Sequence, residues 1–174
     1  MKGFHEIPAE EYVGKCAEKI NPDWMLLTAG APNGTPATMT ISFGAFGFMW
    51  GKHLALCVVR HSRHTLPFVL ENNRFSLAFF DPSWKEKLLW CGRHSGKDND
   101  KIAYCGFHTV FEDGVPFFEE SASALICSLM YKDDIKKTGF VNQQIFDQWY
   151  GHGVHKDDMH DALYGSIDKV LIRD

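Results

Sequence analysis

The chain has 174 residues, a length typical of one domain, and we expect residues 1–174 to fold as one unit with a helical extension at 1–20. Hydrophobic residues make up 45% and charged residues 23%, which is the composition of a globular protein and excludes a largely disordered one. The net charge of −4 argues against a dedicated nucleic-acid-binding protein, because such proteins are usually basic.

The cysteines and the apolar runs predict a cytoplasmic protein without a membrane partner. The cysteines are odd in number and form no CxxC pair, so a disulfide framework is not expected: Cys16, Cys57, Cys91, Cys105 and Cys127. The longest notable apolar run, Leu54–Val59, is far shorter than the ~18–20 residues of a membrane-spanning helix. The N-terminus lacks the apolar region of a signal peptide.

The first elements in chain order are a helix and a hairpin. Pro8, followed by acidic residues, resembles a helix start, and the helix should run to about Ile20. Strands are predicted at Trp24–Ala31 and Thr35–Ser42, because Asn33-Gly34 between them is the strongest short signal for a hairpin turn.

The central part alternates buried strands with short helices. The apolar runs Leu54–Val59 and Phe75–Phe80 predict two buried strands. Three helices are expected in this part, at Thr65–Leu70, Trp84–Cys91 and Asp98–Cys105. Thr65 and Asp81 are the candidate N-terminal caps of the first two, and Gly106 is the candidate C-terminal residue of the third.

The last third of the sequence predicts further antiparallel strands. Asp113-Gly114 predicts a second hairpin, between Thr109–Glu112 and Val115–Phe118. Two longer strands, Ala124–Lys132 and Ala162–Ile172, flank a helix at Asn142–Tyr150. Tight hairpins without long helical crossovers favour a mainly β, antiparallel barrel with peripheral helices.

The segment from Arg60 to Thr65 is a candidate phosphate site. It leaves a buried strand and enters a helix, and it carries two guanidiniums together with the hydroxyls of Ser62 and Thr65. Helix N-terminal N–H groups also favour an anion. A solvated basic loop is the competing interpretation.

The segment Cys91–Lys101 is a second candidate. It is neither a P-loop, because Asp98 follows Gly96-Lys97 in place of Ser or Thr, nor a calcium loop, because Ile102 supplies no oxygen ligand. A basic loop that closes over an anion and a plain helix connection both fit. Arg93 and His94 suggest a lowered pKa for Cys91.

Two other sequence patterns indicate a binding site less strongly. Glycines in Phe43–Gly47, after the strand at Thr38–Ser42, would let the backbone approach a flat ligand, although a bulged barrel strand needs no ligand. His152, His155 and His160 lie near two aspartates, but no HExxH or cysteine partner accompanies them, so we expect no metal.

Taken in order, these motifs resemble the flavin reductase-like, FMN-binding split-barrel proteins, and within them the flavoredoxin-like branch. The matching pieces extend from about residue 20 to the end of the chain: Thr38–Ser42, Val59–Thr65, Cys91-Gly92, Ser95–Asp98, Asp100-Lys101, Phe118–Glu120, and His160 with Gly165–Ile167.

The resemblance implies a six-stranded antiparallel split barrel and a homodimer that binds FMN near the subunit interface. Arg60, Ser62, Arg63 and Thr65 would hold the phosphate, with His64 beside them. Met39, Thr40, Ile41 and Ser42 would line the isoalloxazine ring. Ser95, Gly96 and Lys97 would close over the flavin, and Cys91 precedes that loop.

The implied activity is an oxidoreductase in which FMN carries electrons from NAD(P)H to a flavin or another acceptor, so no protein side chain is expected to be catalytic. The alternatives are a flavoredoxin-type carrier reduced by a protein partner, and a non-catalytic flavin- or heme-binding module.

Overall fold

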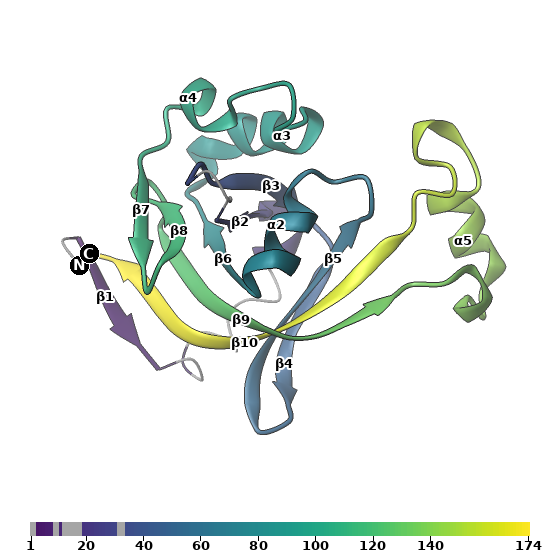
Figure 1. Ribbon diagram of the computed structural model, residues 1–174, viewed down its shortest axis with the longest axis horizontal. Coiled ribbons are helices and arrows are strands. Elements are labelled where there is room, and N and C mark those ends of the chain that lie inside the picture. The colour runs from purple at the N-terminus through teal and green to yellow at the C-terminus, as the bar shows by residue number, and fades with distance from the viewer. Residues whose placement is uncertain (1–2, 9–10, 12–18, 31–33) are drawn as a thin grey trace.

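The computed structural model describes residues 3–8, 11, 19–30 and 34–174. Eight strands form one sheet with the order β3-β2-β6-β9-β10-β5-β4, and β1 pairs with β10 off this path. Their bounds are β1 Phe4–Ile7, β2 Met25–Ala29, β3 Ala37–Ile41, β4 Gly44–Met49, β5 Lys52–Arg60, β6 Arg74–Phe79, β9 Ser123–Asp134 and β10 His160–Arg173. The sheet is strongly curved, and β7 (Thr109–Glu112) with β8 (Val115–Phe118) forms a separate hairpin beside it (Figure 1).

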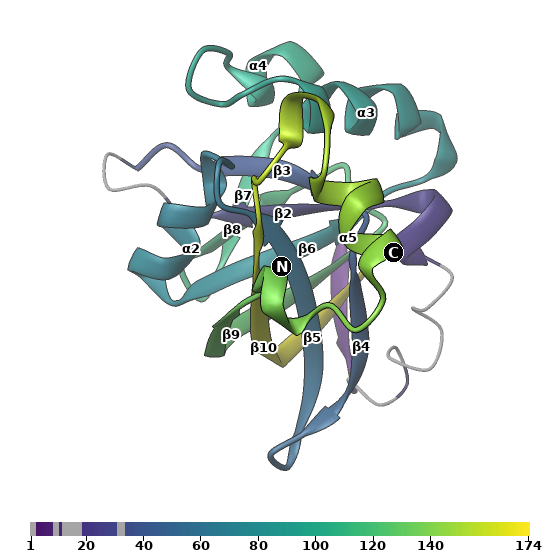
Figure 2. The same cartoon turned by 90° about the vertical axis from the view of Figure 1, so that its right-hand side faces the viewer.

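The helices lie on both faces of the curved sheet and on an excursion from it, residues 135–159, between β9 and β10. They are α2 Thr65–Asn72, α3 Lys85–Arg93, α4 Lys101–Cys105 and α5 Gln143–Tyr150, with short helical turns η1 Lys19–Asp23, η2 Pro82–Trp84, η3 Lys137–Gly139 and η4 Gly153–His155. Helices α3 and α4 lie over β3, whereas α5 lies on the excursion between β9 and β10, which faces the viewer in Figure 2.

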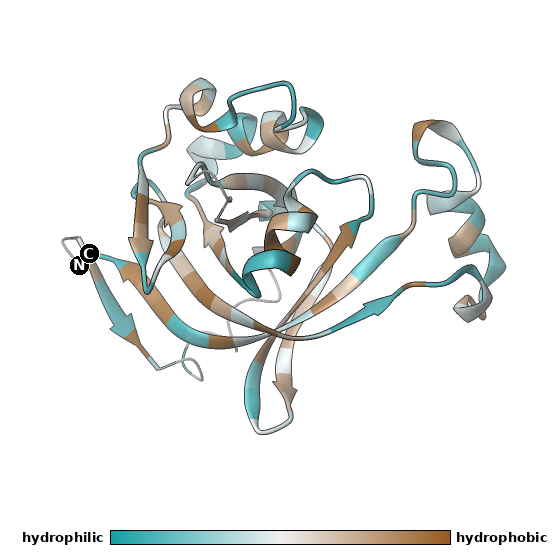
Figure 3. Cartoon of the chain, in the orientation of Figure 1, coloured by the Kyte–Doolittle hydropathy of each residue, from teal (hydrophilic) through white to brown (hydrophobic). Residues whose placement is uncertain are grey.

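Strand β2 separates two apolar clusters. Successive strand residues point to opposite faces. Leu27 packs with Phe75 and Leu163 inside the curved sheet, whereas Leu26 packs with Leu88 and other residues beneath α3 and α4. All five residues of β2 are buried for this reason. Figure 3 shows the apolar residues following the strands, while the α3–α4 connection is hydrophilic.

The expected antiparallel, mainly β fold is confirmed, since each strand pair among the described residues is antiparallel. The sheet exceeds the six strands that the resemblance implied, because β1 joins β10 and β4 joins β5. The hairpin at Asp113-Gly114 has the two positive φ angles, 49° and 76°, of the expected turn.

Several local predictions need correction. Residues 4–7 form a strand and not part of a helical extension, and most of the helix expected at Pro8–Ile20 lies outside the described residues. Asn33 of the first expected turn also lies outside them. Thr65 begins α2 and does not cap it. Helix α4 starts at Lys101, because the Oδ1 atom of Asp100 accepts a hydrogen bond from the Ala103 N–H.

Strand β4 was not expected, and it provides a stability test. A Cβ atom at Gly44 would lie 2.2 Å from the backbone oxygen of Leu56 on β5, whereas one at Gly47 would meet nothing within 4 Å. Gly44→Ala therefore forces the two strands apart, and we expect the free energy of unfolding in urea to fall by about 1–3 kcal/mol. Gly47→Ala, on the same strand, is the control and should change it by less than about 0.5 kcal/mol. Equal losses in both variants would contradict this interpretation.

Candidate functional site

Three adjoining cavities lie along strand β3, next to the loop that follows β5, the α3–α4 connection and the excursion between β9 and β10. They have volumes of about 200, 180 and 370 Å³. Met39 and Arg63 line the first two, and His64, Gly96 and Lys101 line the second and third. The three cavities are therefore neighbours along one face of the molecule.

The first, which we call the ring cavity, lies along β3. Its lining is Met39, Thr40, Ile41, Ser42, Phe43, Val58, Arg60, Arg63, Trp149, His155 and His160. Strand β3 is the last strand of the sheet path, so one of its backbone edges pairs with no other strand of the described sheet. Backbone donors and acceptors at such an edge are available to a ligand or to side chains.

Helix α3 and Lys101 hold β3 in position. The Thr40 hydroxyl donates to the Leu88 carbonyl at 2.5 Å. A Cβ at Gly92 would lie 3.3 Å from Cβ of Thr40, so glycine allows the close approach of α3. The Lys101 ammonium donates to the carbonyls of Thr38 and Cys91 at 2.9 and 2.8 Å. Burial lowers the pKa of Lys101 to about 8.

The second cavity, which we call the cationic cavity, collects positive groups and hydroxyls. It is lined by Met39, Ser62, Arg63, His64, Thr65, Arg93, His94, Ser95, Gly96 and Lys101, and none of these lining residues carries a carboxylate. The Arg63 Nη1 atom donates to the Gly92 carbonyl at 2.9 Å, which fixes the guanidinium under the α3–α4 connection. Burial and the neighbouring charge of Arg60 lower the pKa of Arg63.

Arg60 and Ser62 are engaged with the excursion between β9 and β10. The Asp158 carboxylate accepts the Ser62 N–H at 3.2 Å and the Ser62 hydroxyl at 2.6 Å. Arg60 donates from Nη1 to the Asp158 carbonyl at 2.7 Å, and its guanidinium lies 5.5 Å from the centre of the Tyr150 ring. Burial raises the pKa of Asp158, but the hydrogen bonds from Ser62 and the charge of Arg60 outweigh it, so the net shift is downward.

Aromatic groups complete the ring cavity on the excursion side. Phe43 meets Trp149 edge to face, with ring centroids 4.9 Å apart. Nδ1 of His160 and the Tyr150 hydroxyl are 2.6 Å apart. Burial, followed by the charge of Arg60, lowers the pKa of His160 to about 4, so this imidazole is neutral at pH 7.

The structure brings together nearly all of the residues predicted from the sequence. Met39, Thr40, Ile41, Ser42 and Arg60 line the ring cavity. Ser62, Arg63, His64, Thr65, Ser95 and Gly96 line the cationic cavity, and Lys97 lines the third one.

Cys91 is the exception. Its side chain is fully buried, and its sulfur lies 3.5 Å from that of Cys105. The expected lowering of its pKa is wrong: burial raises the pKa of the Cys91 thiol to about 12, and the Lys101 charge only partly opposes this.

Sequence reasoning gave Lys101, Trp149, His155 and His160 no role in ligand binding, although they line these cavities. Lys101 had a usable signal, because the Asp100 cap places it at the first position of a helix beside a basic loop. His155 was noted only as one of three histidines without a metal-binding pattern, and His160 also as part of a matching motif. Trp149 carried no signal, because it reaches the ring cavity only through the fold of the excursion.

The histidines near the C-terminus do not gather into a metal site. His152 contacts the Asp147 carbonyl, His155 lies 3.6 Å from the Asp158 carboxylate, and His160 contacts Tyr150.

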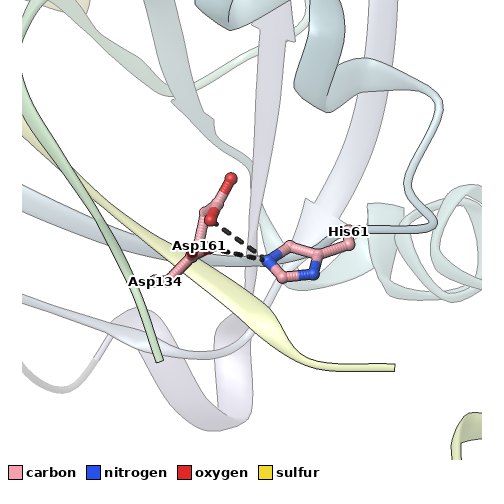
Figure 4. A group of neighbouring side chains, drawn as sticks. All are labelled: His61, Asp134 and Asp161. Carbon is pink, nitrogen blue, oxygen red and sulfur yellow. Dashed lines mark hydrogen bonds and ion pairs between the residues drawn. The ribbon is translucent and has the colours of Figure 1, made fainter. Parts of the chain in front are cut away.

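A different group has ligand atoms close enough to hold a metal ion, and it joins the residue after β5 to residues of β9 and β10. His61 Nε2 lies 3.3 and 3.1 Å from carboxylate oxygens of Asp134 and Asp161 (Figure 4). The Lys132 ammonium, 2.9 Å from Asp161 and 3.5 Å from Asp134, already supplies a cation there.

Comparison with known proteins places the chain in a family. Residues 21–170 match the family described as the flavin reductase like domain. A comparison with curated protein sequences gives no match. Within the described residues, no helix is long and apolar enough to cross a membrane.

Solved structures share the fold at low sequence identity. An FMN-binding protein from Thermus thermophilus is 20% identical with a TM-score of 0.63, over 84% of this chain and 69% of that one. A flavoredoxin from Methanosarcina acetivorans is 19% identical with a TM-score of 0.64, over 85% and 67%. The styrene monooxygenase flavin reductase from Pseudomonas putida S12 is 11% identical with a TM-score of 0.61, over 87% and 85%.

The buried His160 predicts how stability depends on pH. The pKa is 6.5 in the unfolded chain and about 4 in the folded one, so only the unfolded state takes up a proton between these values. The free energy of unfolding should therefore fall by up to about 3 kcal/mol as the pH drops from 6.5 to 4.

His160→Gln should flatten this part of the profile, measured by urea denaturation at several pH values. His152→Gln, at an exposed position, is the control and should leave the wild-type slope. An unchanged slope in His160→Gln would contradict the assignment.

Proposed function

Because the chain belongs to the flavin reductase-like family, we propose that it binds FMN and transfers a hydride or electrons through it, from NAD(P)H to a flavin or another acceptor. The observation that carries this proposal is the cationic cavity, whose lining holds two arginines, two histidines and a lysine without a carboxylate. A phosphate monoester suits such a donor set. The adjoining ring cavity, lined by an edge strand and aromatic groups, suits a flat ligand.

The residues divide between the two ends of the ligand. We assign the phosphate to Arg63, His64 and Thr65, with Ser95 and Gly96 above them. Met39, Thr40, Ile41 and Ser42 would lie along the isoalloxazine ring, and Lys97 would close over the ribityl chain from the third cavity. Arg60 and Ser62, first expected to be phosphate ligands, are assigned to holding the excursion through Asp158.

FMN would supply the redox chemistry, because it accepts a hydride at N5 and passes electrons on singly or in pairs. The chain itself would position the ring and provide fixed positive charge. Lys101 is held by two carbonyls and Arg63 by one, so both are oriented in advance, whereas Lys97 is exposed. Such preorganised charge stabilises negative charge that develops nearby.

The visible absorption spectrum of the purified protein tests the proposal directly. Purified protein should be yellow or should become so when FMN is added, and stopped-flow mixing with NADH or NADPH without oxygen should bleach it. Bleaching only by a reduced protein donor would instead indicate a flavoredoxin-type carrier. Binding without turnover would indicate a non-catalytic flavin or heme module. A colourless protein that takes up no FMN would contradict FMN binding.

An exposed aromatic patch supports the homodimer that we propose. Phe48 and Trp50, near the tip of the β4–β5 hairpin, are 67% and 61% exposed, and Tyr131 beside Trp50 is 49% exposed. Contiguous exposed apolar patches are a feature of interaction surfaces, and we propose this role for the patch. Light scattering after size exclusion should give twice the 19.8 kDa chain mass, and Trp50→Glu should lower the mass toward that of one chain.

We place the protein in the cytoplasm. Cys57, Cys91, Cys105 and Cys127 are free thiols in the structure. Cysteine side chains usually remain thiols in a reducing compartment. NAD(P)H is also present in that compartment. The acceptor in that compartment is a small molecule or a protein.

Arg63 and Arg93 form a matched pair for locating the phosphate. Both line the cationic cavity, but Arg63 is half-buried and held by Gly92, whereas Arg93 is exposed. Arg63→Ala should weaken FMN binding by about 10- to 100-fold, the value of a charge-assisted hydrogen bond. Arg93→Ala should cost less than about fivefold, because water screens an exposed charge. Equal losses in fluorescence titrations would mean that the phosphate lies elsewhere.

Lys101 predicts a pH effect on binding. Its pKa of about 8 means that the ammonium charge is lost as the pH rises from 7 to 9. FMN affinity should therefore decrease over this range, since the protonated lysine attracts the anion. In Lys101→Met the affinity should be lower at pH 7 and should change little by pH 9. A wild-type affinity that is constant or rises with pH would contradict a role for this charge.

A further inference from the structure

Two thiols that the proposed function does not use lie in contact behind the cationic cavity. We propose that Cys91 and Cys105 form a reversible disulfide, which makes this pair a redox modification site of the protein. Their sulfur atoms are 3.5 Å apart, and both side chains are buried, at 0% and 1% exposure. The pair lies in the apolar cluster beneath α3 and α4, which includes Leu26 and Phe107.

The position of the pair in the chain permits bond formation. Cys91 lies in the last turn of α3, and Cys105 is the last residue of the five-residue helix α4. A disulfide needs a sulfur separation of about 2.05 Å, so the atoms must approach by about 1.5 Å. Helix α4 lies between the hydrophilic α3–α4 connection and Gly106, whose φ of 69° turns the chain away. A small movement of this short helix would therefore bring the sulfurs together.

The chemistry requires an oxidant, for which we name a peroxide. The Cys105 sulfur attacks one peroxide oxygen, the O–O bond breaks, and a sulfenic acid and one water form. The Cys91 thiol then attacks the sulfenic sulfur, and a second water leaves as the S–S bond forms. In total, two thiols and one hydrogen peroxide give one disulfide and two waters. A small dithiol reverses the reaction by exchange, with its own oxidation to a disulfide.

The surroundings favour Cys105 as the attacking sulfur. The hydrogen bond from Cys91 and the charges of Lys87 and Lys101 favour its thiolate, although burial still gives a net rise in its pKa. Cys91 is more strongly disfavoured as a thiolate. We expect slower oxidation than at an exposed thiol, and we expect it to end at the disulfide because the second sulfur is in contact.

The bond would constrain the candidate binding site. The segment between the two cysteines carries Ser95, Gly96 and Lys97, and it contacts Arg63 through the Gly92 carbonyl and β3 through Lys101. A link between its ends restricts the motion of the whole segment. Hydrogen exchange of residues 92–104 should therefore slow on oxidation, whether or not FMN binds.

Peptide mapping tests the proposal on the full chain. The protein is treated with hydrogen peroxide, its remaining thiols are alkylated under denaturing conditions, and it is digested with trypsin without reductant. Cleavage after Lys87, Arg93, Lys101 and Lys132 should leave peptide 88–93 joined to peptide 102–132. Dithiothreitol should restore the two separate peptides.

Controls identify the bond. Peptide 102–132 also contains Cys127, so the joined pair of peptides must be absent in Cys105→Ser and must persist in Cys127→Ser, at the mass expected for that variant. Fragmentation of the wild-type joined peptide gives the same assignment if either variant fails to fold. A link through Cys127, a link to Cys16, or oxidation to sulfinic acid without any link would overturn the proposal.

Discussion

The buried ammonium of Lys101 is the contact on which the candidate site depends. It joins the Thr38 carbonyl on an edge strand to the Cys91 carbonyl at the end of α3. Both acceptors are backbone carbonyls, one on an edge strand and one in the last turn of a helix, and leaving such groups buried without a partner is costly. One cation thus satisfies two carbonyls, fixes β3 beneath the helices and positions the α3–α4 connection above the cationic cavity.

A second set of contacts fixes the other side of the ring cavity. The excursion between β9 and β10 extends away from the sheet (Figure 1), and it is tied back through Asp158, Arg60 and Tyr150. The carboxylate of Asp158 neutralises charge on this side, whereas the cationic cavity has no carboxylate in its lining. Arg60 at the end of β5 and Arg63 in the loop after it therefore have different electrostatic surroundings, and we expect only Arg63 to be fully available to an anion.

Sequence reasoning succeeded where the signal was local. Asp113-Gly114 adopts the turn its residue types favour, and the Arg60–Thr65 segment lies at the strand-to-helix junction where it was expected. The β4–β5 hairpin was missed because its turn is Trp50-Gly51, with φ angles of 52° and 73°, and tryptophan is not a residue that signals positive φ. Ser62 and Asp158, which form a hydrogen bond, are separated by 96 residues in the chain. No local sequence pattern indicates a contact between residues so far apart.

The packing of strand β2 on both of its faces limits which parts of the molecule can move. Because Leu26 and Leu27 belong to different apolar clusters, and Leu26 shares its cluster with Leu88 of α3, α3 cannot shift without disturbing the packing inside the sheet. Close-packed interiors transmit displacement and do not absorb it. Helix α3 is therefore a rigid part of the scaffold. Adjustment to ligands of different size must come from the segments at the margins, namely the α3–α4 connection and the excursion that carries Trp149.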